Sequence, residues 1–186
     1  MTDDNRNDTD LSRRQFVGKS SWLAGGAVIS ASLAGCATSP SAAPVAYAGG
    51  SDTLKLAVVG CGGRGTGAAK QALKADAGVE LVAVADAFGD RADTCVSALK
   101  RIYGDERVKV TPETTFVGFD AFSQAIDMAD VVILATPPGF RPEHFEYAVA
   151  GNKQIFCENP MATDAYGIRR VLAAAKEAEE KKLNVV

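Results

Sequence analysis

The feature that most constrains the fold is a glycine-rich segment that directly follows a short, mostly apolar run. The run is Leu54-Lys55-Leu56-Ala57-Val58-Val59, which is typical of a strand buried on both faces of a sheet. The next six residues, which fit the spacing G-x-G-x-x-G, are Gly60-Cys61-Gly62-Gly63-Arg64-Gly65. A helix is predicted over residues 64–75. Strand, glycine turn and helix in this order predict the start of a parallel β-α-β unit.

The rest of the chain alternates between strand and helix patterns. Further strands are predicted at 79–85, 115–117, 131–135 and 154–157, and further helices at 90–103, 120–128, 142–150 and 164–182. Gly104 is expected to end the second helix, and residues 183–186 look like the opening of a sixth strand. Strands separated by such helices pair in parallel through right-handed crossovers. The predicted fold class is therefore a doubly wound α/β Rossmann sheet, which binds ligands at the carboxyl ends of its strands.

Composition excludes several classes of protein. The chain has 186 residues, of which 47% are hydrophobic and 23% charged, and this fits one globular domain and excludes wholesale disorder. The net charge is −3 and the 20 Lys and Arg residues are scattered, so no nucleic-acid partner is expected. The four cysteines form no C-x-x-C pair, so neither a disulfide framework nor a metal site is predicted.

Residues 1–50 have the composition of a targeting segment. Arg13 and Arg14, followed by Phe16, resemble the twin-arginine signal of bacterial export. The uncharged, weakly apolar stretch over residues 22–34 is too short for a membrane span and fits the core of a signal peptide. The alternative is an amphipathic N-terminal helix that contains an incidental arginine pair. Export predicts a periplasmic location.

The signal has two candidate ends. Leu33-Ala34-Gly35-Cys36 resembles a lipoprotein box, in which Cys36 becomes the acylated first residue, whereas Ala46-Tyr47-Ala48 resembles an ordinary signal-peptidase site. A lipid anchor at Cys36 or the signal itself is the only membrane contact expected. Residues 37–52, rich in Ala, Ser, Pro and Gly, are predicted to form a flexible tether. The chain thus divides into signal and tether at 1–50 and a dinucleotide-binding domain at 51–186.

The glycine loop predicts a dinucleotide site because of its context. Gly60 permits the tight turn, Gly62 the approach of a pyrophosphate, and Gly65 the packing of helix on strand. Backbone N–H groups of the loop, which also includes Cys61, Gly63 and Arg64, and the positive end of the helix dipole face the phosphates. The alternative is a glycine turn selected for packing alone. A second hypothesis concerns Cys61, whose thiolate a helix N-terminus would stabilise, although a small filler residue also fits there.

Asp86 stands at the tip of the second predicted strand. Its carboxylate can accept hydrogen bonds from the ribose hydroxyls of NAD and repels a 2′-phosphate, so NAD is expected and NADP is less favoured. Arg91 can lie near the same ribose and weaken that preference. The alternative role for Asp86 is to cap the helix that follows.

Four motifs in the same order resemble those of the Gfo/Idh/MocA oxidoreductases. Besides the glycine loop, they are Val82-Ala83-Val84-Ala85-Asp86, Ala135-Thr136-Pro137-Pro138 and Phe156-Cys157-Glu158-Asn159-Pro160-Met161-Ala162. The resemblance covers about residues 54–186, the N-terminal half of that family. It implies an NAD(P)-binding Rossmann domain that passes hydride to or from a carbon of a sugar or cyclitol. It also implies that Thr136 and Pro137 lie along the nicotinamide half of the cofactor and that Glu158 contacts the nicotinamide ribose region.

The resemblance breaks at three places. Asn159 stands where the family has a lysine that assists proton transfer, and a neutral amide cannot act as an acid or base near neutral pH. Pro160 is no departure: it matches the last position of the family's E-K-P motif and is expected to follow a cis peptide bond. The family's histidine after the T-P-x loop has no clear match, because Phe140 or Arg141 stands nearest that place. His144 lies about one helical turn later; a position on the helix surface is expected for it, and a catalytic role is the alternative. The third break is the absence of the family's second domain from the sequence.

These departures leave more than one function open. The first is the cofactor-binding module of an exported oxidoreductase, inactive or weak as an isolated chain unless an oligomer or a second chain completes the site. The second is a non-catalytic nucleotide-binding or scaffold protein, which the lipid anchor at Cys36 would hold at a membrane. A fragment without a stable fold is the third. The substrate, the direction of the reaction and the fate of Cys36 stay open.

Overall fold

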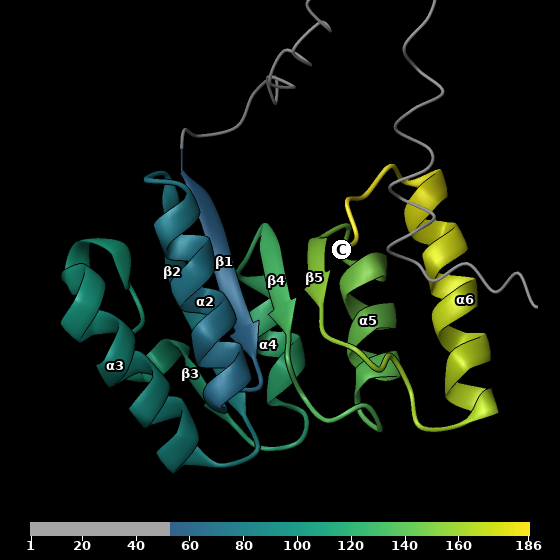
Figure 1. The fold of residues 1–186 in the computed structure, drawn as a ribbon, viewed down its shortest axis with the longest axis horizontal. Coiled ribbons are helices and arrows are strands. Elements are labelled where there is room, and N and C mark those ends of the chain that lie inside the picture. Colours follow the sequence, from purple (N-terminus) through teal and green to yellow (C-terminus); the bar gives the residue numbers. More distant parts are fainter. Residues whose placement is uncertain (1–52) are drawn as a thin grey trace, which may run out of the picture. The chain divides into compact units, whose positions relative to one another are not determined.

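In the computed structural model, which describes residues 53–186, five parallel strands form one sheet in the order β3-β2-β1-β4-β5 (Figure 1). The order reverses between β1 and β4, as in a doubly wound sheet. This confirms the predicted Rossmann class. The strands are β1 (Leu54–Val59), β2 (Val79–Asp86), β3 (Thr115–Val117), β4 (Val131–Leu134) and β5 (Gln154–Cys157). The predicted twin-arginine signal, the two signal ends and the tether up to residue 52 lie outside the described residues.

Helices cover both faces of the sheet (Figure 1). The helices on one face are α2 (Gly63–Ala75) and α3 (Gly89–Arg107). Those on the other face are α4 (Ala121–Asp127), α5 (Arg141–Ala150) and α6 (Ala165–Glu180), and a short 3₁₀ turn, Pro112–Thr114, precedes β3. Each face has its own core because side chains alternate along a strand: Leu56 and Val58 of β1 join the core under α2, whereas Ala57 and Val59 join the other. Burying a side chain such as Leu56 contributes about 1.5–3 kcal/mol.

The strand register determines where the site forms. Val59, the last residue of β1, pairs with Ala85 of β2 and with Leu134 of β4, and Leu134 in turn pairs with Cys157 of β5. The carboxyl ends of four strands therefore lie in one row. The predicted motifs follow directly after these residues, so the fold brings together segments that are far apart in the sequence.

The segment α3 consists of two helical pieces that meet at a kink. Gly104 at the kink is not helical (φ 71°), so the first piece ends where predicted, and a further helical turn continues to Arg107. The guanidinium of Arg107 donates to the backbone oxygens of Val79 (2.9 Å), Leu73 (3.0 Å) and Asp76 (2.6 Å). These contacts with the α2–β2 connection hold the extra turn in place.

The predicted sixth strand is present only as a single bridge. Val185 pairs in parallel with Ile155, and the N–H of Cys157 donates to Val186 O at 2.7 Å. The remaining predicted strands and helices agree with the structure to within a few residues. Within residues 53–186 no helix combines the length and the hydrophobicity needed to cross a membrane.

Candidate dinucleotide site

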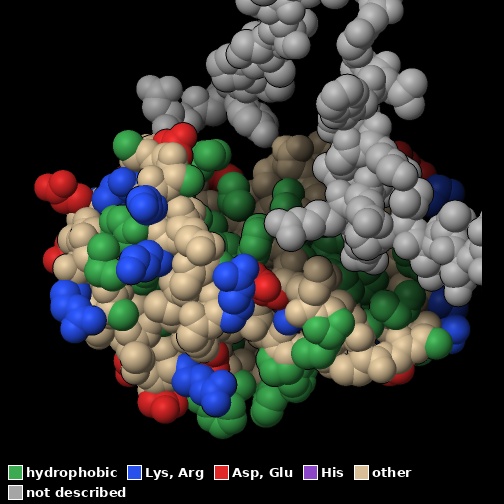
Figure 2. All heavy atoms as spheres, viewed as in Figure 1, with side chains coloured by type: hydrophobic (Ala, Val, Ile, Leu, Met, Phe, Trp, Pro, Cys, Tyr) green, Lys and Arg blue, Asp and Glu red, His purple; other side chains and the backbone are tan. Residues whose placement is uncertain are grey.

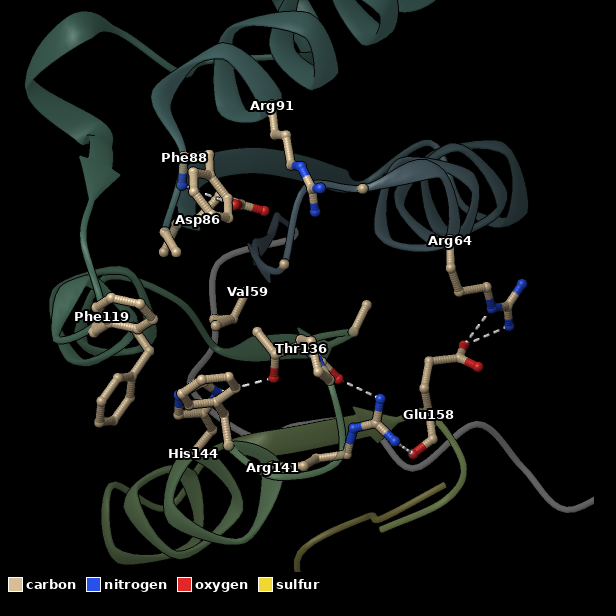
Figure 3. Close-up of a pocket in the computed structure, with 18 of the residues that line it drawn as sticks. Val59, Arg64, Asp86, Phe88, Arg91, Phe119, Thr136, Arg141, His144 and Glu158 are labelled. Atoms are coloured by element: carbon tan, nitrogen blue, oxygen red, sulfur yellow. Dashed lines mark hydrogen bonds and ion pairs between the residues drawn. The ribbon is translucent and has the colours of Figure 1, made fainter. Parts of the chain in front are cut away.

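A cleft of about 430 Å³ opens at the row of strand ends (Figure 3). It lies between the glycine loop on one side and the segments after β4 and β5 on the other. The predicted site residues that line it are Gly60, Gly62, Arg64, Asp86, Thr136, Pro137, Glu158 and Asn159. Cys61, Gly63 and Gly65 belong to the same loop but are not among its lining residues. The edge of the sheet where a ligand is expected therefore contains a cavity.

The three glycines of the motif differ in their surroundings. Gly60 has φ 95°, and a Cβ there would lie 2.7 Å from the carbonyl carbon of Ala135. A Cβ on Gly65 would lie 1.8 Å from the oxygen of Gly60, so helix α2 packs against the loop at this point. A Cβ on Gly62 would meet nothing within 4 Å. The first and third glycines are required by the protein itself, whereas the second leaves open space at the cleft.

The carboxylate of Asp86 fixes the glycine loop. One oxygen accepts the N–H of Cys61 at 2.7 Å, and the other accepts the N–H of Phe88, the N-cap residue of α3, at 3.0 Å. A carboxylate has about four acceptor positions, so these two bonds leave capacity for ribose hydroxyls. Arg91 also lines the cleft, and its guanidinium carbon lies 5.1 Å from the centre of the Phe88 ring. Asp86 thus both stabilises the start of α3 and lies at the cleft, where its carboxylate is available to a ligand.

Cys61 does not have the environment of a reactive thiolate. Its side chain is buried, and the thiol donates to the backbone oxygen of Ala85 at 3.5 Å. A side-chain hydrogen bond with Cys95, together with burial, raises the pKa of Cys61 far above that of a free thiol. The thiolate hypothesis for Cys61 is wrong, and the residue packs as a small apolar side chain.

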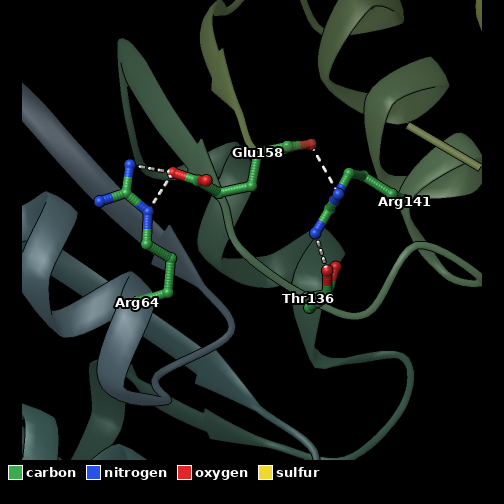
Figure 4. A network of polar contacts seen from close by, with 4 residues as sticks. All are labelled: Arg64, Thr136, Arg141 and Glu158. Carbon is green, nitrogen blue, oxygen red and sulfur yellow. Dashed lines mark hydrogen bonds and ion pairs between the residues drawn. The ribbon is translucent and has the colours of Figure 1, made fainter. Parts of the chain in front are cut away.

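An ion pair joins the two sides of the cleft. Arg64 donates from Nε to the Glu158 carboxylate at 2.6 Å, and a second guanidinium nitrogen lies 2.5 Å from the same oxygen (Figures 3 and 4). Arg64 is the second residue of α2, and Glu158 follows β5. Both side chains line the cleft. A cationic donor, Arg64, and an anionic acceptor, Glu158, are therefore both available to a dinucleotide bound between α2 and the end of β5.

Arg141 connects the segments that follow β4 and β5 (Figure 4). This buried side chain donates to the backbone oxygens of Glu158 (2.6 Å), Pro160 and Thr136, while its Nε has no partner within the described residues. Sequence reasoning did not predict this role. The sequence held a weak signal of this role: Arg141 lies in the first turn of a helix, where a cation is unfavourable beside the positive end of the helix dipole, so other contacts must stabilise it.

His144 is buried, which corrects the prediction of a surface residue. Its Nδ1 lies 3.0 Å from the hydroxyl of Thr136, and its ring stacks on Phe122 with centroids 4.2 Å apart. Burial, with a smaller contribution from the charge of Arg141, lowers the pKa of His144 to about 4. A neutral histidine therefore orients the Thr136 hydroxyl at the cleft. The peptide bond between Asn159 and Pro160 is cis, as predicted.

Comparison with known proteins agrees with this geometry. A family model described as "Oxidoreductase family, NAD-binding Rossmann fold" matches residues 54–185. The chain belongs to the Gfo/Idh/MocA oxidoreductase family. It is 30% identical over 122 residues to an inositol 2-dehydrogenase of Cereibacter sphaeroides, covering 66% of this chain and 33% of that protein. It is 32% identical over 129 residues to an inositol 2-dehydrogenase of Rhizobium meliloti, covering 69% and 34%.

Solved structures share the same fold. The myo-inositol 2-dehydrogenase of Lactobacillus plantarum superposes with a TM-score of 0.57 at 21% identity, over 72% of this chain and 36% of that one. The scyllo-inositol dehydrogenase of Lactobacillus casei, solved with bound NAD(H) and scyllo-inositol, gives 0.55 at 24% identity, over 72% and 35%. The chain thus spans about a third of the length of the Gfo/Idh/MocA relatives it matches. The family match identifies residues 54–185 as the NAD-binding Rossmann fold of an oxidoreductase family.

Proposed function

We propose that residues 53–186 bind NAD for an oxidoreductase that transfers hydride between nicotinamide and a hydroxyl-bearing carbon of a sugar or cyclitol. The observation that carries this proposal is the cleft where open Gly62 and the carboxylate of Asp86 stand beside the start of α2. The relatives that are inositol 2-dehydrogenases support a cyclitol as the substrate class.

The adenosine and pyrophosphate parts of the cofactor fit the glycine-loop side of the cleft. A Cβ on Gly62 would occupy the space that a pyrophosphate needs, and the free N–H groups at the start of α2 point toward an anion there. Asp86 would accept hydrogen bonds from the ribose hydroxyls. Its charge would repel a 2′-phosphate, which favours NAD over NADP although Arg91 lies nearby.

The nicotinamide half fits the other side of the cleft. Thr136 and Pro137 would lie along the nicotinamide ring, and Glu158 near its ribose. His144 and Arg141 fix the Thr136 segment, through the Thr136 hydroxyl and the Thr136 backbone oxygen respectively. When bound, the nicotinamide would supply the hydride chemistry at C4. Asn159 lines the cleft where the family has lysine and can orient a hydroxyl but not exchange a proton with it.

Because of Asn159, we propose that the chain alone turns over weakly or not at all. A lysine that assists proton transfer typically contributes a factor of about 10²–10⁴ in rate. The same residue favours a second candidate function, a nucleotide-binding protein without catalysis. Binding of NAD without turnover would support this second function, and dehydrogenase turnover by the chain would exclude it.

The binding proposal is tested by calorimetry on the full chain with NAD and NADP. We expect heat with NAD and weaker binding of NADP. Gly62→Leu should abolish NAD binding without unfolding the protein, because a Cβ there meets no protein atom within 4 Å and the side chain would fill the pyrophosphate space. Gly67→Leu is the matched control, since a Cβ on Gly67 also meets nothing within 4 Å and Gly67 does not line the cleft. A folded wild-type chain that gives no heat with either dinucleotide would overturn the proposal.

We further propose that residues 1–50 export the protein to the periplasm through the twin-arginine pathway. The arginine pair and the apolar stretch after it support this. Substituting Lys for both Arg13 and Arg14 should keep the protein in the cytoplasm in a fractionation experiment. Cys36→Ser should release exported protein from the membrane if acylation occurs and leave its distribution unchanged if the signal is cut at residues 46–48.

A further inference from the structure

The buried side chain of Arg141 places a positive charge at the cleft that no carboxylate of residues 53–186 neutralises. The side chain is only 4% exposed, lines the cleft, and forms no ion pair with any residue in that range. Its guanidinium donates to the backbone oxygens of Thr136, Glu158 and Pro160 (Figure 4), which are dipoles without net charge. A buried charge usually has an ionised partner, because its removal from water is costly. Arg141 therefore keeps a full positive charge where the segments after β4 and β5 form the cleft.

The neighbouring residues at this end of the cleft do not offset the charge of Arg141. Glu158 is paired with Arg64, whose guanidinium lies 2.5 Å from its carboxylate, so these two charges largely cancel. His144 is neutral at pH 7, since burial, with a smaller contribution from Arg141, lowers its pKa to about 4. Asn159 carries no charge. On the face drawn in Figure 2, most acidic side chains lie at the periphery, and one lies near the centre beside a basic side chain. The nicotinamide end of the cleft is therefore net positive.

A positive charge at this place distinguishes the two oxidation states of the cofactor. The nicotinamide ring of NAD⁺ carries a positive charge, and a hydride added at C4 removes it, so the ring of NADH is neutral. The rest of the dinucleotide is the same in both states. A fixed cation beside the ring therefore repels NAD⁺ but not NADH, and more strongly in a cleft than in open water. Asp86 and Arg91, the remaining charged residues of the cleft, lie on β2 and α3 and act on both states alike.

We infer that the charge of Arg141 makes the chain bind NADH more tightly than NAD⁺. The inference rests on the proposed function, which places the nicotinamide along Thr136 and Pro137, next to the backbone oxygen that Arg141 holds. Arg141 is then a positioning residue with a second, electrostatic effect on the cofactor. Tighter binding of NADH raises the reduction potential of the bound couple, by about 30 mV for each tenfold difference between the two dissociation constants. Bound NAD⁺ is then a stronger hydride acceptor than free NAD⁺.

The test is calorimetry on the full chain at neutral pH with NAD⁺ and NADH. In the wild-type chain we expect the dissociation constant of NAD⁺ to exceed that of NADH about tenfold or more. Arg141→Gln should reduce this ratio to about threefold or less, because the charge is lost. Arg141→Lys should keep most of the ratio, because it retains the charge without the planar donor group. Binding of ADP, which has no nicotinamide, reports whether each variant retains the adenosine side of the cleft.

Two further variants sharpen the test. Arg107→Gln is the matched control, since Arg107 also donates to three backbone oxygens but does so at the α2–β2 connection and does not line the cleft. Its loss should leave the ratio of the two dissociation constants unchanged. Glu158→Gln keeps Arg141 in place and removes the carboxylate that neutralises Arg64. The cleft then becomes more positive, and the ratio should rise above that of the wild-type chain.

The outcomes separate this inference from the proposed function. Equal affinities of the wild-type chain for NAD⁺ and NADH would overturn the inference, while the dinucleotide site stands. A ratio that Arg141→Gln leaves unchanged, or that Arg141→Lys loses to the same extent, would also overturn it, since neither result fits an effect of charge. If Arg141→Gln does not fold, Glu158→Gln decides, and a ratio no higher than in the wild-type chain would contradict the inference. A wild-type chain that binds neither NAD⁺ nor NADH would overturn both.

Discussion

At the scale of single residues, Asp86 has a structural and a ligand-binding task in the same carboxylate. Asp86→Asn leaves only one accepting oxygen for the N–H groups of Cys61 and Phe88. Because a hydrogen bond to a charged group contributes about 1.5–3 kcal/mol, we expect urea denaturation to show a free energy of unfolding lower by an amount of this order. Loss of the negative charge should also lower the ratio of the NADP dissociation constant to the NAD dissociation constant, because the 2′-phosphate is no longer repelled. Asp93→Asn is the control, because Asp93 is an exposed carboxylate on α3. An unchanged ratio of the two dissociation constants in Asp86→Asn would contradict a ribose-binding role for Asp86.

His144 makes stability depend on pH. Its pKa in the folded protein is about 4, below the ordinary value of 6.5, so the unfolded chain binds the proton more readily. The contribution is fully present above pH 6.5 and is lost as the pH falls toward 4. By pH 4.5 the free energy of unfolding should have fallen by about 2–3 kcal/mol from its value at neutral pH. Urea denaturation at pH 7 and pH 4.5 should show this loss in the wild-type chain and a smaller loss in His144→Asn. Equal pH dependence of the two proteins would exclude His144 as its cause.

Between elements, the Arg64–Glu158 ion pair connects α2 with the end of β5 without a ligand. Glu158→Gln would free Arg64 and remove a negative charge from the phosphate path. We expect ADP to bind severalfold more tightly, with an advantage that shrinks as salt screens the charges. The stability should change little, since Arg64 is largely exposed to solvent. Calorimetry with ADP at low and high salt measures this, and Glu106→Gln on α3 controls for net charge alone. Weaker ADP binding in Glu158→Gln would show that the carboxylate helps to hold the nucleotide.

The elements themselves could largely be predicted because their periodic patterns are local. Apolar runs of β1 and β4 and the helix after the glycine loop need no knowledge of distant contacts. The separate helical turn after Gly104 could not be predicted, since it depends on Arg107 reaching backbone oxygens at the α2–β2 connection. The burial of Arg141 and His144 was missed for the same reason. A polar residue at the start of a helix looks solvent-exposed until the fold supplies its partners.

At the scale of the whole molecule, the cleft exists only while the sheet is intact, because its walls follow five different strands. A ligand of this cleft binds the folded chain and not the unfolded one. NAD at about 100 times its dissociation constant should then stabilise the fold by about 2.7 kcal/mol and raise the midpoint of a single thermal transition by several degrees. All lining residues lie between Val59 and Asn159, so a chain beginning at Thr53 should show the same shift. Differential scanning calorimetry on both chains, with the Gly62→Leu variant as the negative control, measures this. A transition that NAD leaves unmoved in the wild-type chain would show that the strand ends do not form a dinucleotide site.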